Sequence, residues 1–317
     1  MSILARPAVA SLAAKAMQRI APMAFRLANK RSGEASLLHR FAEYPRRTRE
    51  LTIPTSIAPA KAVVYLPDAA VDTPPPVYVN LHGGGYVLAM TEIDDSLCRY
   101  LAAEAGVVVI NVDYVVAPQY RFPAAPRQAF DVVQWVAEHG AEHGWDGGRL
   151  IVGGQSAGGG LAAAVARQAL EEGGPTIALQ VLHYPPLDLA ADARDKSSVI
   201  AKPMLRPWMA DVFNSAYIPN APRRTDRLAS PAHPSDTADL AGIAPAYVIT
   251  AEYDLLRAEG ARYAERLDEA GALVEHYDVP EADHAYDGKD AAKAREVYAL
   301  IARHVRQATR TEASAAD

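Results

Sequence analysis

The sequence has a single cysteine, no excess of positive charge and no long apolar run, and each of these absences excludes a class of protein. Cys98 has no second cysteine to pair with, so the chain forms no internal disulfide and fits a reducing compartment. No stretch reaches the roughly 20 apolar residues that a transmembrane helix needs. The net charge of −6, with 22% charged residues, argues against a nucleic-acid partner and against disorder. We expect a folded cytoplasmic protein without stable membrane insertion.

Acidic residues are missing from residues 1–30, which are rich in Ala, Leu and Met. In a signal peptide, the basic residues precede the apolar stretch. Here Arg6 and Lys15 interrupt the apolar stretch, which argues against a signal peptide. One helical face of this segment collects the side chains of Val9, Leu12, Ala16, Met17 and Ile20. This pattern predicts an amphipathic helix that packs on the body of the protein. A helix that lies on a membrane surface is the alternative.

From about residue 60, short β-rich runs alternate with helical patterns. The predicted strands are 62–66, 77–81, 107–112, 150–153, 177–183, 247–251 and 274–279. The predicted helices are 95–105, 124–138, 157–172, 258–270 and 291–306. Nearly unbroken apolar runs, such as residues 107–110, are typical of strands that helices cover on both faces. The fold class is therefore α/β, with a mostly parallel sheet.

Two regions interrupt this alternation, and we expect them to form a small helical cap. The first is the N-terminal segment, residues 1–50, and the second is an insertion at about 188–229 that contains one helix near 208–217. Residues 51–308 then form the main α/β domain, and the polar residues 309–317 form a flexible tail.

The pentapeptide Gly154-Gln155-Ser156-Ala157-Gly158 lies between a predicted strand and a predicted helix. A serine at such a sharp turn has its hydroxyl exposed, because small neighbours let strand and helix approach closely. A glycine-rich turn with an ordinary N-capping serine is the alternative. We predict that Ser156 is a nucleophile.

A second motif, His82-Gly83-Gly84-Gly85, closes the predicted strand 77–81. Attack on an acyl carbonyl creates an oxyanion, and glycine backbone offers N–H groups that no side chain obstructs. The candidate donors are Gly83, Gly84 and Ala157. A merely flexible loop would not explain why the glycines stand at the end of a strand.

A serine nucleophile needs a histidine to take its proton and an acid to orient that histidine. Asp254 and His284 each follow a predicted strand, in the chain order serine, acid, histidine. The other candidates fit less well, since His276 lies within a strand, His304 in the last helix and His233 upstream of Asp254. We predict a Ser156–His284–Asp254 triad.

These motifs together resemble the hormone-sensitive-lipase-like family of bacterial esterases. Further matches include 112–114, 117–118, 122–125, 230–231, 250–254, 256–257 and 259–260. The resemblance implies an α/β-hydrolase fold with an eight-stranded sheet and a helical cap. It also implies a serine carboxylesterase or lipase-like hydrolase, which cleaves short to medium acyl esters through an acyl-enzyme and needs no cofactor or metal.

Several positions depart from the family pattern. Gln155, Val115, Gln119 and Gln128 stand where an acid, Arg, Glu and Asp are usual. We therefore expect a thinned network of charges around the site. Ala285 and Tyr286 replace a usual Gly-Phe after the histidine, which is expected to narrow the wall beside the base.

A stripe of large side chains predicts the substrate pocket. Met209, Phe213 and Tyr217 follow i, i+4, i+8 spacing on the helix of the insertion, and with Tyr86 they are expected to line an acyl pocket. Simple packing is the alternative interpretation of such a stripe.

Other functions remain as alternatives. His139, Glu142 and His143 spell a zinc-hydrolase pattern, although Gly140 and Gly144 weaken the helix it requires. The run from Gly158 to Ala163 matches a dinucleotide motif, but it lies inside the predicted helix.

Lactones, carbamates and arylamides are alternative substrates for the same triad. A ligand-binding pseudoenzyme is the non-enzyme alternative, against which the presence of His284 argues. The natural acyl and alcohol groups stay open, as does the oligomeric state, with a homodimer as one alternative.

Overall fold

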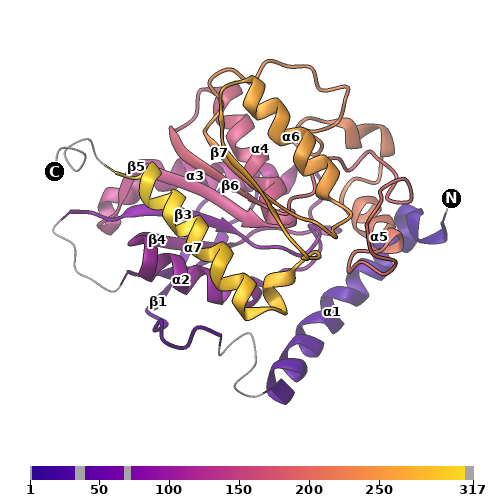
Figure 1. Ribbon diagram of the computed structural model, residues 1–317, viewed down its shortest axis with the longest axis horizontal. Coiled ribbons are helices and arrows are strands. Elements are labelled where there is room, and N and C mark those ends of the chain that lie inside the picture. The colour runs from indigo at the N-terminus through magenta and orange to yellow at the C-terminus, as the bar shows by residue number, and fades with distance from the viewer. Residues whose placement is uncertain (1, 33–39, 68–72, 311–317) are drawn as a thin grey trace.

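A single eight-stranded sheet organises the computed structural model, which describes residues 2–32, 40–67 and 73–310. Its strands are β1 (Thr48–Ile53), β2 (Ala60–Tyr65), β3 (Pro76–Leu81), β4 (Val108–Asp113), β5 (Asp146–Gln155), β6 (Ile177–His183), β7 (Ala246–Ala251) and β8 (Leu273–Val279). The α-helices are α1 (Pro7–Ser32), α2 (Asp95–Ala105), α3 (Ala124–His139), α4 (Ala157–Glu172), α5 (Pro207–Tyr217), α6 (Arg257–Glu269) and α7 (Ala291–Ala308). Figure 1 shows this arrangement.

The strand order is β1-β2-β4-β3-β5-β6-β7-β8. β2 runs antiparallel to β1 and β4, whereas the pairs from β4 to β8 are parallel. The carboxyl ends of these parallel strands meet at one edge of the sheet, where open α/β folds place their sites. The mostly parallel sheet agrees with the class expected from the sequence.

Strand β1 was not among the predicted strands. Only Ile53, at its end, is buried, so the strand lacks the apolar run that marks its neighbours. β1 is held at the edge of the sheet by its antiparallel register with β2, from Thr48 opposite Tyr65 to Ile53 opposite Ala60. Because β1 begins at Thr48, the sheet starts slightly before the expected boundary at residue 50.

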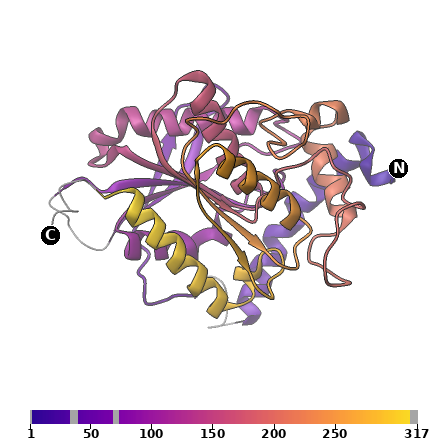
Figure 2. The ribbon, with the colours of Figure 1, turned by 45° about the horizontal axis from the view of Figure 1, so that its top comes forward.

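Helices cover both faces of the sheet, as Figure 2 shows. In β3, Val77, Val79 and Leu81 belong to the core shared with α3, α4 and α6, while Tyr78 belongs to the core shared with α2 and α7. Successive side chains of a strand point to opposite faces, so a strand that is buried along its whole length supplies both cores.

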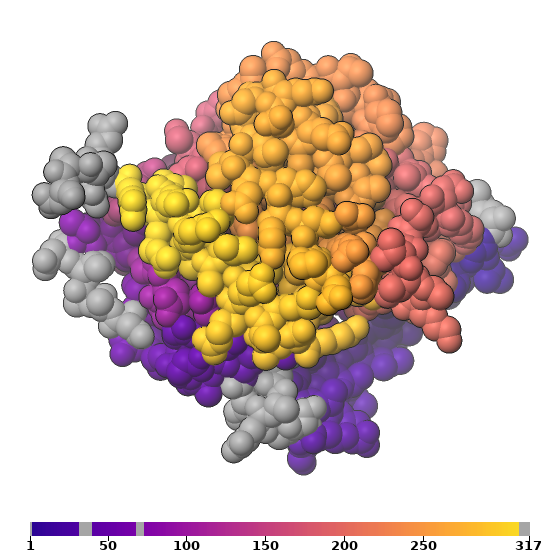
Figure 3. Space-filling model, in the orientation of Figure 1, coloured from indigo at the N-terminus to yellow at the C-terminus, as the bar shows by residue number. Residues whose placement is uncertain are grey.

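The first helix buries a different face from the one predicted. Ala10 and Ala14 are fully buried, while Leu12 and Ile20 are 69% and 63% exposed. Small alanines let α1 lie close to α5, and Gln18 donates hydrogen bonds to the carbonyls of Val87 and Ala117 at 2.8 and 2.9 Å. Packing space and a polar anchor therefore set the rotation of this helix, rather than its largest apolar side chains. Figure 3 shows α1 and α5 on the same side of the molecule.

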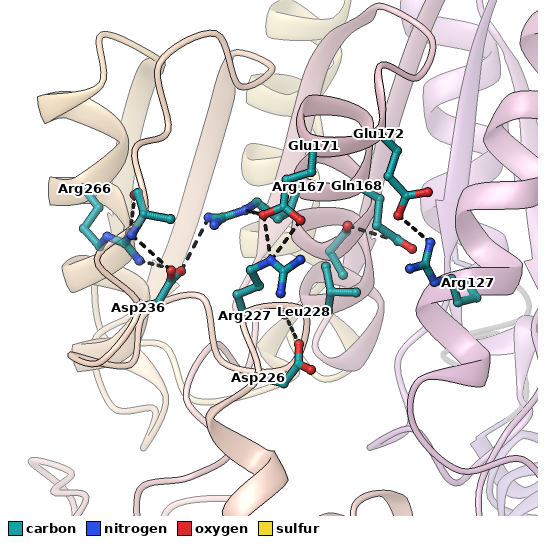
Figure 4. Close-up of polar contacts among 12 residues, drawn as sticks. Arg127, Arg167, Gln168, Glu171, Glu172, Asp226, Arg227, Leu228, Asp236 and Arg266 are labelled. Atoms are coloured by element: carbon teal, nitrogen blue, oxygen red, sulfur yellow. Dashed lines mark hydrogen bonds and ion pairs between the residues drawn. The ribbon is translucent and has the colours of Figure 1, made fainter.

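An ion-pair network anchors the chain where it returns from the insertion to the sheet (Figure 4). The buried Arg167 of α4 pairs with Glu171 and lies 3.5 Å from Asp236, which also pairs with Arg266 of α6 at 3.1 Å. Arg227 donates to Glu171 at 2.7 Å. These contacts tie residues 227–236 to two helices of the main body.

None of the helices in the described ranges is both long and apolar enough to cross a membrane. Of the expected flexible tail, residues 311–317 lie outside the described residues. Thr309 is buried, and its carbonyl accepts a hydrogen bond from Arg149 at 3.2 Å. The ordered body thus extends past the end of α7.

The buried Asp94, which directly precedes α2, allows a test of how stability depends on pH. Burial raises the pKa of Asp94 to about 8, against a hydrogen bond from Asn80 that lowers it. The folded protein binds this proton more tightly than the unfolded chain does. The wild type therefore loses stability as the pH rises from about 4 to that raised pKa. Asp94→Asn should therefore raise the melting temperature more at pH 8.5 than at pH 5, as measured by calorimetry.

Glu142→Gln is the matched control, because it makes the same change from carboxylate to amide at an exposed position. An effect of Asp94→Asn that is the same at pH 5 and pH 8.5 would contradict the prediction.

Candidate active site

Ser156 sits at a strained turn between β5 and α4. Its backbone has φ 52° and ψ −122°, a conformation rare for any residue other than glycine. The turn requires glycine on both sides of Ser156. A Cβ at Gly158 would lie 1.7 Å from the Leu81 carbonyl oxygen, and a Cβ at Gly154 would lie 2.2 Å from the same atom. The Ser156 N–H donates to the His183 carbonyl at 2.9 Å, which ties the turn to β6.

The three residues predicted as a triad lie within hydrogen-bond distance of one another, in the order Ser156, His284, Asp254. His284 Nε2 lies 2.9 Å from Ser156 Oγ, and His284 Nδ1 lies 2.6 Å from Asp254 Oδ2. Asp254 and His284 are 1% and 4% exposed, so little water competes for these contacts. A carboxylate that accepts from Nδ1 leaves Nε2 free to take a proton from the serine, which is the chemistry of an activated nucleophile.

The glycine loop after β3 lies beside the serine. A Cβ at Gly83 would lie 3.6 Å from Ser156 Cβ, and Gly83, Gly84 and Gly85 line a cavity with Ser156. In the described part of the chain, the N–H groups of Gly83, Gly84 and Ala157 donate to no acceptor. These three groups therefore stay available to an oxyanion.

His82 supports this loop from below. Its Nδ1 lies 2.6 Å from the Gly83 carbonyl, and its ring stacks on Tyr114, whose hydroxyl donates to the His82 carbonyl at 2.9 Å. Complete burial lowers the pKa of His82 to about 4, so the ring is neutral near pH 7. We assign it to the shape of the loop rather than to proton transfer.

Two cavities meet at the serine, and Ser156 and Phe213 line both. The smaller, of about 80 Å³, is lined by Tyr86, by apolar side chains that include Leu189 and Leu255, and by the basic Lys196 and Arg206. The larger, of about 310 Å³, is lined by Met209 and His284 together with Phe25 of α1. The N-terminal helix thus contributes to the wall of the site.

The predicted pocket residues divide into two groups. Tyr86, Met209 and Phe213 reach the cavities, whereas Tyr217 lines neither of them. The Tyr217 ring stacks on Tyr86 with centroids 4.2 Å apart, and its hydroxyl end is buried in the core. The i+8 position of the stripe is therefore packing, because that ring is buried against Tyr86 and Phe122. Phe25 carried no sequence signal that distinguished it from its helix neighbours.

The positions that depart from the family pattern hold neutral contacts in place of charges. Gln128 accepts from the Val115 N–H at 2.7 Å and donates to the Ala58 carbonyl at 2.8 Å. Gln119 donates to Gln18 of α1 at 2.8 Å. Gln155 differs, since its amide donates to the buried carboxylate of Asp287. An acid that no motif indicated therefore lies next to the site.

Neither rival motif forms the site it would need. His139 stacks on Trp135, and His143 on Trp145, at centroid distances of 5.1 and 4.8 Å. Within residues 2–32, 40–67 and 73–310, no cluster of three or more His, Cys, Asp and Glu side chains could hold a metal ion. The glycines from Gly158 onward pack α4 against the sheet.

Comparison with known proteins places this geometry in a family. The model of a family described as the α/β-hydrolase fold matches residues 78–287, about two thirds of the chain. The chain belongs to that family. It is 35% identical to esterase LipI of Mycobacterium tuberculosis over 248 residues, which cover 76% of this chain and 75% of that protein.

Solved structures of related enzymes extend the match over nearly the whole chain. The carboxylesterase EstE1, cloned from a metagenomic library, covers 98% of this hydrolase and 100% of its own chain, with 31% identity and a TM-score of 0.82. An esterase of Pyrobaculum calidifontis is 34% identical over 89% of this chain and 92% of its own, with a TM-score of 0.78. The predicted fold, the resemblance to hormone-sensitive-lipase-like esterases and the predicted enzyme class are confirmed.

The position of Ser156 predicts its labelling by an organophosphate. Ser156→Ala should keep the fold and lower activity by about four to six orders of magnitude, because the remaining groups cannot replace the nucleophile. Intact-mass spectrometry should show one adduct on the wild type. A Ser235→Ala control, which removes an exposed serine instead, should show the same adduct. An adduct that persists in Ser156→Ala would show that another residue is the nucleophile.

Proposed function

We propose that this α/β-hydrolase cleaves carboxylic esters with short to medium acyl chains through an acyl-enzyme on Ser156. The observation that carries the proposal is the hydrogen-bonded series Ser156–His284–Asp254, which opens on an apolar cavity beside unpaired backbone N–H groups. The names of the relatives, which include an ethyl acetate hydrolase of Pseudomonas putida at 36% identity over 64% of that protein, support it.

The proposed reaction has two halves. Ser156 Oγ attacks the ester carbonyl while His284 Nε2 takes the hydroxyl proton, and the N–H groups of Gly83, Gly84 and Ala157 hold the oxyanion. The carbon–oxygen bond to the alcohol breaks as His284 returns the proton to the leaving oxygen. A water molecule then attacks the acyl-enzyme, His284 takes its proton, and the acid leaves as the proton returns to Ser156.

The proposed cap consists of the N-terminal segment before β1 and of the insertion at about 188–229, which interrupts the catalytic domain. Phe25 from the first segment and Met209 and Phe213 from the second line cavities with Ser156, which supports this division. We place the acyl chain in the cavity that Met209 and Phe213 line. Lactones, carbamates and arylamides share the same tetrahedral chemistry, so a panel of p-nitrophenyl esters, lactones and amides decides between them.

The proposal includes a cytoplasmic enzyme that acts on a small molecule. The single buried Cys98 and the net charge of −6 support this setting and the absence of a nucleic-acid partner. A homodimer is an alternative to the monomer, and analytical ultracentrifugation of the purified chain distinguishes the two.

Activity should require a neutral His284. Because the imidazole must accept the serine proton, kcat/KM should rise with pH as a histidine loses its proton, and then reach a plateau. His284→Ala should abolish this rise together with most of the activity. Asp254→Asn should be nearly as damaging, since an amide at this position favours the wrong imidazole tautomer. A profile that is flat from pH 5 to pH 8 would contradict the role of the histidine.

The cavity that Met209 and Phe213 line should set the acyl length. Each added methylene gains about 0.8 kcal/mol while it fits, so kcat/KM should rise with length and fall beyond roughly eight carbons. Met209→Ala and Phe213→Ala should move this maximum to longer chains. Trp208, half-exposed on the same helix and outside both cavities, gives the control, since Trp208→Ala should leave the profile in place.

An unchanged profile in both cavity variants would remove the pocket assignment without affecting the triad. Cleavage of long-chain triglycerides as fast as butyrate esters would have the same consequence.

A further inference from the structure

Asp287 is a buried acid that the proposed reaction does not use. It lies in a short 3-10 helix, η7 (Tyr286–Gly288), three residues after His284, and it is 5% exposed. Its carboxylate accepts hydrogen bonds from the Gln155 amide, from the Tyr184 hydroxyl at 2.7 Å and from the Tyr298 hydroxyl at 2.8 Å. Three hydrogen-bond donors therefore surround this one carboxylate.

No ion pair balances this charge within the described ranges. The nearest cation that contacts the residue is Arg40, and its guanidinium donates to the backbone carbonyls of Asp287 and Gly288 rather than to the carboxylate. The negative charge is held by dipoles instead, so its field is not cancelled at close range. A buried, unpaired charge is costly and indicates a role beyond packing.

The hydrogen bonds of Asp287 lead to both reacting side chains. Gln155 immediately precedes Ser156 at the strained turn, so its amide connects the carboxylate to the nucleophile's backbone. Tyr184 connects it to the base, because the Tyr184 ring packs edge-on against the His284 ring with centroids 4.9 Å apart. Asp287, Ser156 and His284 line one cavity.

We propose that Asp287 is a positioning residue for the proposed ester hydrolysis, which couples the Ser156 turn to the His284 ring and whose negative charge favours the protonated imidazole formed during acylation. The inference rests on the proposed function. Asp287 does not touch the reacting atoms, and it acts through Gln155 and Tyr184 and through its field.

The titratable groups that face this region come from several elements. They are His183 and Tyr184 at the end of β6, Asp94 before α2, Tyr298 on α7, Tyr286 beside Asp287, and Asp254 and Asp283 beside His284. Arg40 is the cation that contacts η7.

Burial keeps many of these groups neutral near pH 7. It lowers the pKa of His183 to about 4 and raises the pKa of Asp94 to about 8. Burial also raises the pKa values of Tyr184, Tyr286 and Tyr298 well above their usual range, and the charge of Asp287 adds to that rise. The carboxyl groups around the imidazole are then Asp254, which is hydrogen-bonded to it, Asp283 and Asp287.

The decisive experiment exchanges the two partners. Asp287→Asn should lower kcat for p-nitrophenyl butyrate about 10- to 100-fold, which is the size of effect expected when residues in one hydrogen-bond network are uncoupled. The substitution should change KM by less than about 3-fold. It should also move the acid limb of kcat/KM to lower pH, because without the negative charge the imidazole loses its proton more readily. The double variant Gln155→Glu/Asp287→Asn returns a carboxylate to the same hydrogen bond, and it should regain most of kcat and the original acid limb.

Tyr298→Phe is the matched control, since it removes one hydrogen bond to Asp287 and leaves the charge. It should lower kcat only a few-fold and leave the acid limb in place. Circular dichroism and melting temperatures verify that each variant is folded. An Asp287→Asn enzyme with wild-type kcat and acid limb would overturn the proposal. So would a loss of activity with an unmoved acid limb and no recovery in the double variant, which indicates a structural role alone.

A second measurement separates this proposal from the ester-hydrolase function. The rate at which a fluorophosphonate labels Ser156 reports on the activation of the serine without any ester turnover. Asp287→Asn should label about 10-fold more slowly than the wild type, and the double variant should recover. If the wild type hydrolyses no ester but shows this pattern, the proposed substrate is wrong and the coupling stands. If ester hydrolysis is present and the labelling rate is unchanged in Asp287→Asn, the coupling is wrong and the function stands.

Discussion

The close approach of α4 to the end of β3 is the constraint on which the rest of the site depends. Without a side chain at Gly158, the helix reaches the Leu81 carbonyl, and a Cβ there would sit at an impossible 1.7 Å. This approach forces Ser156 into its strained conformation and brings it next to Gly83. The nucleophile and the oxyanion donors are thus positioned by one contact between main chains, which side-chain motion cannot relax.

Electrostatics around the site are arranged by burial more than by ion pairs. His82 and His183 are buried and stay neutral near pH 7, and Asp94 is shifted toward its protonated form. Two carboxyl groups connect to the imidazole: Asp254 is hydrogen-bonded to it, and Asp287 accepts from neutral donors, one of which packs against the ring. Because both groups are buried, little water screens the effect of each carboxyl group on the imidazole.

Two kinds of polar contact hold the segments outside the sheet: neutral hydrogen bonds for α1, and ion pairs for the end of the insertion. Gln18 fastens α1 to backbone carbonyls near the glycine loop, and Gln119 pairs with it. Ion pairs are concentrated farther away, where Arg167, Asp236 and Arg266 fix the return from the insertion. Ion pairs therefore hold the base of the insertion, whereas neutral hydrogen bonds hold α1 near the glycine loop.

The sequence by itself determined the sheet class, most strand and helix positions, and the three residues that the structure brings together at the site. These features follow from local rules: apolar periodicity, glycine at tight turns, and the positions of Ser156, Asp254 and His284 after their strands. Tertiary structure alone decided the edge strand β1, the buried face of α1 and the direction of Tyr217, since each depends on what packs against it. It also decided the place of Asp287 beside Gln155, 132 residues apart in the chain, because no local pattern records which side chains two distant loops bring into contact.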